Sequence, residues 1–202
     1  MAARSIEAAQ ALAAETGAEA HRSDAADRGA VIDVVKGRGP LDILVVNAGA
    51  LAMGDPLELD ADAVDRMIDI SVRAPYHAAV EAARQMPDGG RIIVIGSVNG
   101  DRMPFAGGAA YALTKSALQG MARGLARDFG DRGITVNIVQ PGPTNTDMNP
   151  EDGPMRELMH SFMAIKRHTS GDEVAGMVAY LAGPEAAMVT GALHTIDGGF
   201  GA

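Results

Sequence analysis

Three short hydrophobic runs stand out along the chain: LDILVVN at 41–47, RIIVIGS at 91–97 and ITVNIVQPG at 134–142. Each run is rich in β-branched residues, and its apolar residues are consecutive rather than alternating with polar ones. Such runs are typical of strands that helices cover on both faces, as in a parallel sheet. The pattern therefore predicts three buried parallel strands.

The segments between these runs have helical periodicity. Two long ones, at 61–86 and 109–130, predict helices, and a shorter one at 27–36 has an apolar stripe of Val31, Val34 and Val35. Pro75 is expected to kink or divide the first long helix, because proline lacks the backbone N–H that the helix interior needs.

Weaker patterns complete the predicted order of elements. They are an alanine-rich helix ending near Gly17, a weak strand at 19–23, two short helices after residue 142 and a last strand near 193–197. Strands that alternate with helices of this length predict βαβ crossovers. The expected fold is one Rossmann-like α/β domain over residues 1–202, a doubly wound parallel sheet in three layers.

Composition removes several classes of function. The chain has 202 residues, 47% of them hydrophobic, a formal net charge of −9 and no cysteine. The negative charge argues against nucleic-acid binding, and the lack of cysteine excludes disulfides and thiolate metal sites. No metal site is expected, no apolar run is long enough for a membrane helix, and no secretory signal is present. We expect a cytoplasmic protein without membrane contact.

Ligands of doubly wound sheets bind beyond the carboxyl ends of the strands. The segments that follow the three strong strands, 47–49, 96–100 and 140–146, consist largely of small and polar residues and should converge on one crevice. Each alone would be an ordinary turn.

Nearby in sequence, Tyr111 and Lys115 in AAYALTKSAL share a helix face. A lysine that snorkels from an amphipathic helix is the alternative explanation for that pair.

These motifs together resemble the short-chain dehydrogenase/reductase family over the whole chain. The similar segments are VNAG at 46–49, Ser97 with Tyr111-x-x-x-Lys115, VNIVQPGPTNT at 136–146, VTGALHTIDGG at 189–199 and Asp24. The resemblance implies a catalytic set of Ser97, Tyr111 and Lys115, with Ser71 at the position of a fourth residue. It implies cofactor contacts from Asp24, Asn47, Ala48, Gly49, Tyr111, Lys115, Pro141, Gly142, Thr144 and Thr146. The two threonines are explained nearly as well as plain loop residues.

The implied chemistry is carbonyl reduction or alcohol oxidation with NADP or NAD, NADP being favoured. Tyr111 would be the proton donor, and Ser97 would hydrogen-bond to the substrate oxygen. Lowering a phenol pKa from about 10 to about 7 takes roughly 4 kcal/mol, which one positive charge about 4 Å away supplies at an effective dielectric constant of about 20. Lys115 is therefore expected to lower the pKa of Tyr111.

The sequence departs from the family pattern at the fourth catalytic position. The family has an asparagine in its long central helix, where this chain has Ser71 in DISVRAPYHA. A serine cannot offer both an amide donor and a carbonyl acceptor, so the relay of protons to water is in doubt. The substitution Ser71→Asn is expected to raise turnover.

The second departure is at the N-terminus. The family's first strand, Gly-rich turn, helix and second strand have no counterpart in the chain, so roughly 35 to 45 residues are expected to be absent, on the usual size of such a unit. Cofactor affinity should fall, the strand at 41–47 should have an open edge, and the strand at 19–23 should lose its neighbours. A misassigned start codon is the favoured explanation.

Three functions stay open at this stage. The first is an oxidoreductase acting on a small carbonyl or alcohol substrate, with a 3-oxoacyl thioester as the best guess. The second follows from GSVNGDRMP, QGMARGLARDFG and HSFMAIKRH, which resemble a cyclic-di-GMP-binding, biofilm-dispersing branch of the family; Arg102 and residues 166–168 could meet its phosphates, or belong to a solvated loop. The third is an inactive fragment.

The resemblance also implies a homodimer or homotetramer packed through 61–86 and 109–129.

Overall fold

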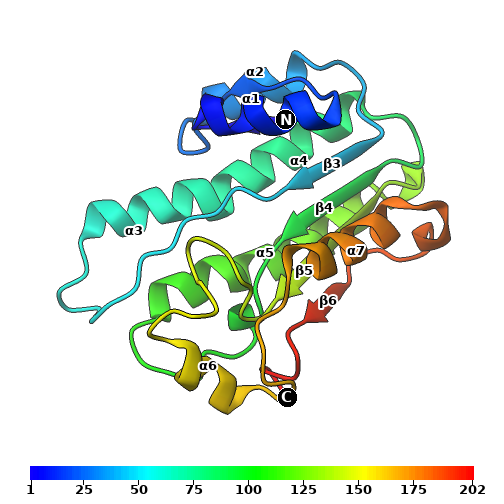
Figure 1. Cartoon of the computed structure of the whole chain (residues 1–202). Coiled ribbons are helices and arrows are strands. Elements are labelled where there is room, and N and C mark those ends of the chain that lie inside the picture. Colours follow the sequence, from blue (N-terminus) through cyan, green and yellow to red (C-terminus); the bar gives the residue numbers. More distant parts are fainter.

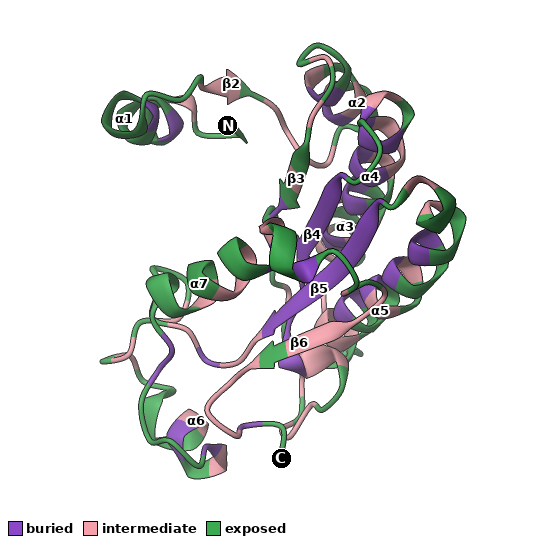
Figure 2. Ribbon diagram, turned by 90° about the vertical axis from the view of Figure 1, so that its right-hand side faces the viewer, coloured by how far each residue is buried: buried purple, intermediate pink, exposed green.

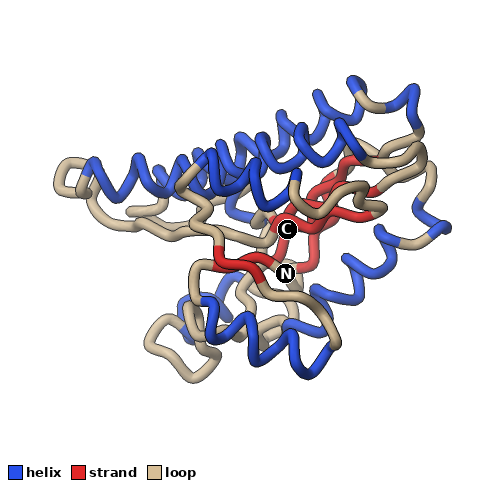
Figure 3. Tube along the Cα trace, turned by 90° about the horizontal axis from the view of Figure 1, so that it is seen from above, coloured by secondary structure: helices blue, strands red, loops and turns tan.

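A parallel sheet of four strands forms the centre of the computed structural model, which describes all residues from 1 to 202. The strand order is β3 (Ile43–Val46), β4 (Arg91–Ile95), β5 (Thr135–Pro141) and β6 (Leu193–Ile196) (Figure 1). Helices lie on both sides of the strands (Figure 3). The prediction of a three-layer, doubly wound α/β fold is confirmed.

Alternate residues of the central strands enter two separate cores. Ile92 and Val94 pack in a large core with α2 (Arg28–Lys36), α4 (Ala74–Gln85) and α5 (Ala109–Asp128). Ile93 packs on the opposite face, against Leu181 of α7 (Gly171–Ala182). The predicted burial of both faces is therefore confirmed for β4 and β5, because side chains of a strand alternate between its two faces.

The long central helix is divided, as Pro75 predicted. Helix α3 (Ala61–Ile68) passes through a π-helical turn at Asp69–Arg73 into α4. Pro75 lacks the N–H that the carbonyl of Ser71, four residues before it, would accept in a regular helix. The wider turn absorbs this loss and buries Ser71, which is 1% exposed, on the side facing the sheet's carboxyl end.

The edge strand β3 differs from the prediction that both of its faces are buried. Leu44 and Val46 pack against the large core, but Ile43 and Val45 are 45% and 44% exposed and β3 pairs only with β4. The predicted open edge is confirmed. The predicted strand at 19–23 does not lack a neighbour: β2 (His21–Arg22) pairs with β1 (Ala2–Ala3) in a separate two-stranded sheet.

This small sheet and the helix α1 (Ile6–Thr16) stand to one side of β3 (Figure 2). Helix α1 ends as predicted at Gly17, whose φ of 70° is a left-handed conformation that suits glycine. The remaining helix, α6 (Arg156–Phe162), lies close to the C-terminus (Figure 1). It follows the loop after β5, beside the carboxyl ends of the strands.

A lysine on the open edge of β3 should oppose pairing with another chain. We expect Val45→Lys to lower the aggregated fraction at least about twofold at tens of micromolar protein, because charged side chains discourage edge-to-edge pairing. Size-exclusion chromatography with light scattering measures that fraction. Leu57→Lys is the control, since Leu57 is 93% exposed away from the strand. Equal aggregation of both variants and the parent chain would show that the edge of β3 is not the site of self-association.

Candidate active site

Ser97, Tyr111 and Lys115 come together where β4 ends and α5 begins. Ser97 follows β4 directly, and Tyr111 and Lys115 lie in the first two turns of α5. The Ser97 hydroxyl acts on the pKa of the Tyr111 phenol, and Lys115 Nζ lies 5.7 Å from the centroid of the Tyr111 ring. The i and i+4 spacing brings the phenol and the ammonium to one helix face. The three side chains thus form one compact cluster at the predicted crevice.

The turn between β4 and Ser97 depends on Gly96. A Cβ at this position would lie 2.6 Å from Cγ2 of Ile138 on the neighbouring strand, so any residue with a Cβ would clash there. Ser97 itself is 8% exposed, and its Oγ also accepts a hydrogen bond from the backbone N–H of Asn99 at 3.2 Å. The serine therefore caps a short turn and faces Tyr111 at the same time.

Lys115 is buried at the bottom of the cluster, with 6% of its surface exposed. Its Nζ donates a hydrogen bond to the carbonyl oxygen of Ile95, at 3.3 Å. Burial lowers the pKa of Lys115 from its ordinary 10.5 to about 8, because the charged ammonium loses its hydration. At neutral pH this lysine is mostly charged in a site with little water.

The pKa of Tyr111 changes in the direction opposite to the prediction. Burial raises the pKa of the phenol, and the hydrogen bond from Ser97 opposes that rise. Desolvation disfavours the phenolate and is the largest cause of the rise, and Lys115, whose Nζ lies 5.7 Å from the ring centroid, is not among the causes that lower the pKa. The expectation of an acidic phenol was therefore wrong for the chain alone, and a neutral Tyr111 remains suited to donating a proton.

The turn after β3 borders the same cluster. Asn47, Ala48 and Gly49 are exposed there, and a Cβ built on Gly49 would lie 3.6 Å from Lys115 Nζ. Ser71 holds this turn: its buried Oγ accepts a hydrogen bond from the N–H of Ala50 at 3.2 Å. The structure gives Ser71 no hydrogen bond to Lys115 or Tyr111, so it positions the turn rather than relaying protons directly.

Ser71→Ala should therefore loosen the turn that Ser71 holds. An unpaired N–H at Ala50 costs about 1 kcal/mol, which corresponds to about fivefold weaker nicotinamide dinucleotide binding. Calorimetric titration measures this change, and Ser5→Ala, at an exposed position, is the control.

Ser71→Asn keeps an acceptor and is expected to raise turnover; equal turnover of Ser71→Asn and the parent chain would mean that this position does not limit the reaction.

Asp24 lies farther from the cluster, after β2. Its carboxylate accepts hydrogen bonds from the N–H of Ala26 at 3.0 Å and from Arg66 at 3.0 and 3.2 Å. The bond from Ala26 and then that from Arg66 hold the pKa of Asp24 below its usual value. The carboxylate stays charged, but Arg66 already pairs with it.

The loop after β5 supplies the other predicted contacts. Gly142, next to Pro141, packs so closely on Asp197 that a Cβ would lie 2.6 Å from the Asp197 Cβ. The hydroxyl of Thr144 donates to the carbonyl of Gly142 at 3.0 Å, whereas Thr146 is exposed. Thr144 and Thr146 thus act mainly as loop residues in the structure.

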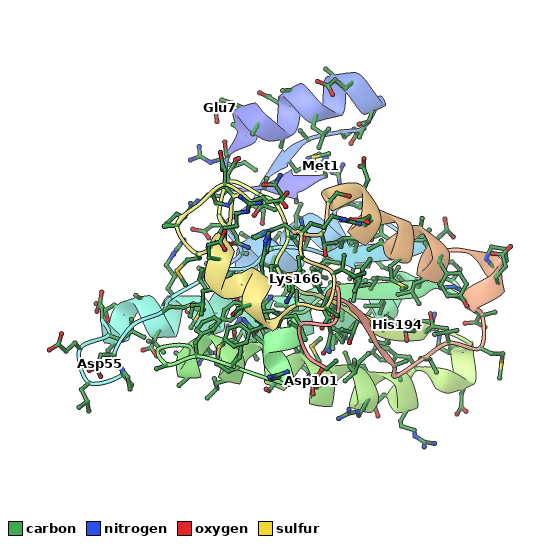
Figure 4. All side chains as sticks on the ribbon, turned by 60° about the horizontal axis from the view of Figure 1, so that its bottom comes forward. Met1, Glu7, Asp55, Asp101, Lys166 and His194 are labelled. Carbon is green, nitrogen blue, oxygen red and sulfur yellow. The ribbon has the colours of Figure 1, made fainter.

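Sequence reasoning missed a hydrogen-bond network of two amides and a carboxylate beside this loop. Gln140 is 1% exposed and donates to Asp101, while Gln119 donates to both, at 2.8 Å to Asp101 and 3.0 Å to Gln140. Figure 4 places Asp101 beside α5. Gln140 is a polar residue within an apolar strand, and that position was the available signal for a buried hydrogen-bond partner.

The candidate phosphate contacts are already engaged within the chain. Arg102 donates to the carbonyls of Phe200 and Ala202, and Lys166 donates to that of His160 at 2.7 Å. Arg167 forms an ion pair with Glu173 at 2.6 Å. The cationic side chains proposed from the sequence therefore stabilise the C-terminal segments.

The chain matches known proteins along its whole length. The family described as Enoyl-(Acyl carrier protein) reductase matches residues 1–201. The cyclic-di-GMP-binding biofilm dispersal mediator protein of Escherichia coli (strain K12) is 70% identical over 198 residues, covering 98% of this chain and 84% of that protein. The 3-oxoacyl-[acyl-carrier-protein] reductase MabA of Mycobacterium bovis is 35% identical, covering 89% of this chain and 73% of that one.

Solved structures agree with these relatives. The crystal structure of BdcA in complex with NADPH has a TM-score of 0.97 and 68% identity, covering 100% of this chain and 83% of that one. A short-chain dehydrogenase/reductase from Serratia marcescens has a TM-score of 0.95 and 48% identity, covering 99% and 85%. No helix of this chain is both long and apolar enough to cross a membrane. With the Ser97, Tyr111 and Lys115 cluster at the carboxyl end of its parallel sheet, the chain belongs to the short-chain dehydrogenase/reductase family of oxidoreductases.

Proposed function

We propose that the chain interconverts a ketone and a secondary alcohol with a nicotinamide dinucleotide, NADP(H) in preference to NAD(H), at the Ser97, Tyr111 and Lys115 cluster. The observation that carries this proposal is the convergence of Ser97, whose hydroxyl lowers the pKa of Tyr111, with the Tyr111 ring and the buried Lys115 ammonium 5.7 Å from its centroid. The preference for NADP(H) is supported by the NADPH in the complex of BdcA, which is 68% identical to this chain.

The residues present fit one half of such a cofactor. Gly49 leaves its Cβ position free 3.6 Å from Lys115 Nζ, so a ribose hydroxyl can approach the ammonium there. The pyrophosphate half has no equivalent support, because the chain's Gly-rich DGGFGA turn directs the N–H groups of Gly199 and Gly201 at its own Asp197, at 2.9 and 2.7 Å. We expect weak dinucleotide binding by this chain.

When bound, the reduced nicotinamide supplies a hydride to the carbonyl carbon. Ser97 donates a hydrogen bond to the carbonyl oxygen and stabilises the negative charge that develops on it. Tyr111 gives its phenol proton to the same oxygen, which completes the alcohol. Lys115 stabilises the phenolate that remains, and its burial excludes the water that would weaken this interaction.

A thioester of a 3-oxoacyl chain is the proposed substrate class. It is supported by the 35% identity to a 3-oxoacyl-[acyl-carrier-protein] reductase and by the apolar side chains that border the site. Val98 packs there with Met163 and Phe200, and Phe105, Met159 and Phe162 surround them. The partly exposed Phe105, Met159 and Phe162 suit an acyl chain better than a charged substrate.

A second candidate function is the binding of cyclic-di-GMP. It is supported by the 70% identity to the biofilm dispersal mediator protein, which covers 98% of this chain. The engagement of Arg102, Lys166 and Arg167 in contacts of their own argues against it as the main function. Free arginine side chains would otherwise be the natural partners of its phosphates.

A homodimer or homotetramer is part of the proposal. Leu113 of α5 is 57% exposed, and Tyr76 of α4 is 47% exposed. Gly120 and Gly124 lie about two and three turns beyond Leu113 with open space at their Cβ positions. Small residues along an exposed helix allow close packing against a second copy.

Calorimetric titration with NADPH, NADH and cyclic-di-GMP, followed by assay of a 3-oxoacyl thioester with NADPH, tests these candidates. The proposal expects NADPH binding, weaker NADH binding and oxidation of NADPH that depends on the thioester. Binding of cyclic-di-GMP without NADPH binding would favour the second function. If the chain is folded by circular dichroism and binds none of the three ligands, the oxidoreductase function and the cyclic-di-GMP-binding function are both contradicted.

A further inference from the structure

Glu151, His160 and His168 meet beside the active site, in the segment between β5 and α7. Each offers one nitrogen or oxygen atom, and these three atoms lie within 4.8 Å of one another. His160 belongs to α6, Glu151 to the turn before it and His168 to the loop after it. No part of the proposed redox reaction uses these residues.

Both histidines are buried, and their pairing is incomplete. His160 is 8% exposed and His168 is 3% exposed, with His160 Nε2 and His168 Nδ1 2.9 Å apart. His168 Nε2 is buried without a hydrogen-bond partner. An imidazole nitrogen left unpaired inside a protein is unfavourable, because it loses its hydration without a replacement. A bound ion between His160 Nε2 and His168 Nδ1 would account for the contact of the two buried rings, whereas His168 Nε2, the other nitrogen of its ring, takes no part in it.

Glu151 connects the histidines to the surface. Its Oε1 accepts a hydrogen bond from the N–H of His168 at 3.2 Å. The carboxylate also lines an open pocket of about 310 Å³ together with Asn145, Asp152 and Arg156. Asp152 adds a negative charge to this pocket and Arg156 a positive one, so a cation from solvent would meet Glu151 in a pocket with an excess of one negative charge.

We propose that Glu151, His160 and His168 bind a divalent transition-metal ion, for which zinc is the best fit. Two imidazoles and one carboxylate are a donor set that zinc uses in proteins, with ligand bonds of about 2.0–2.2 Å and a fourth position left for water. In a tetrahedral site such bonds separate the ligand atoms by roughly 3.3 Å. The 2.9 Å between the two ring nitrogens has to widen slightly, and separations of up to 4.8 Å within the cluster have to shorten, to reach that value.

The metal would hold the segment that covers the active site. Helix α6 carries His160 on one side, and Phe162 and Met163 at its end pack with Val98, the residue after Ser97. His168 precedes Thr169, which forms a β-bridge with Thr144 in the loop after β5. A metal bond between these parts would fix the wall of the substrate pocket without touching the reacting atoms. Figure 4 shows Lys166, between the two histidines in sequence, beside α6.

Zinc and cobalt binding to the tag-free chain, stripped of metal with a chelator, tests the site. We expect one Zn²⁺ per chain by calorimetry and mass spectrometry, a higher melting temperature with zinc, and visible absorption bands of a four-coordinate site with Co²⁺. The variants Glu151→Gln, His160→Asn and His168→Asn should each weaken zinc binding by more than the 10–100-fold that loss of an outer-sphere partner costs. His77→Asn, on α4, is the control and should leave binding unchanged.

Two results would overturn the proposal. One is a parent chain that binds no zinc and gives cobalt bands no different from those of free Co²⁺. The other is binding that is equal in His77→Asn and in the three site variants. Glu151 is only half-buried, so Glu151→Gln should fold even where a histidine variant does not, and circular dichroism of the metal-free variants checks this. Because all readouts are of metal binding, they do not depend on the redox activity.

Discussion

Replacing Tyr111 with phenylalanine is expected to lower turnover of a 3-oxoacyl thioester by about 100- to 10,000-fold, the range that loss of a general acid produces. The variant keeps the ring and loses only the hydroxyl that bonds to Ser97. Dinucleotide affinity should therefore change by less than about threefold, which is under 1 kcal/mol. Steady-state kinetics and calorimetry on the same preparation measure the two quantities.

Tyr76→Phe is the matched control for this experiment. Tyr76 lies on α4 and is 47% exposed, outside the Ser97 cluster, so its hydroxyl should not affect turnover. If Tyr111→Phe retained the turnover of Tyr76→Phe, Tyr111 would not be the proton donor. If it lost dinucleotide binding as well as turnover, the hydroxyl would have a structural role that the contacts do not reveal.

Replacing Lys115 with methionine is expected to abolish turnover and to stabilise the fold at neutral pH. The folded-state pKa of Lys115, about 8, lies below its ordinary value of 10.5. Above pH 10.5 the amine is neutral in the folded and the unfolded state, so it does not lower the stability of the fold. As the pH falls from 10.5 through about 8, the unfolded state takes up the proton first and stability is lost. Below that pH the charged lysine destabilises the folded state by roughly 3 kcal/mol, at about 1.36 kcal/mol per pKa unit.

Methionine has a similar length and no charge, so it removes this cost but also the hydrogen bond to Ile95. The net gain in the free energy of unfolding should be about 1–3 kcal/mol at pH 6–7 and should shrink as the pH approaches 10. Urea unfolding across that pH range measures it. Lys36→Met, at the exposed end of α2, should show no such trend. A destabilised Lys115→Met chain at pH 6 would mean that the ammonium has partners that offset its burial.

The local patterns were sufficient for most of the fold. Consecutive apolar residues identified β4 and β5, and helical periodicity identified α4 and α5. These patterns were sufficient because all four elements bury side chains in the large core, and the spacing of those side chains along the chain follows from the type of element. Pro75 identified the division of the central helix for a covalent reason, since it has no N–H to donate. The same patterns could not show that Ile43 and Val45 are exposed, because exposure depends on which elements lie beside β3.

Within the candidate site, the i and i+4 spacing by itself predicted that Tyr111 and Lys115 share a helix face, and the resemblance to the family added Ser97 to them. Only the tertiary structure decided how these groups ionise, because the pKa of Tyr111 and of Lys115 depends on the water that distant segments exclude. It also decided that Glu151 joins two histidines, since the loop between them has no regular spacing and is shaped by packing on α6 and the C-terminus. Spacing fixes neighbours along one helix, whereas burial and convergence arise only when the whole chain has folded.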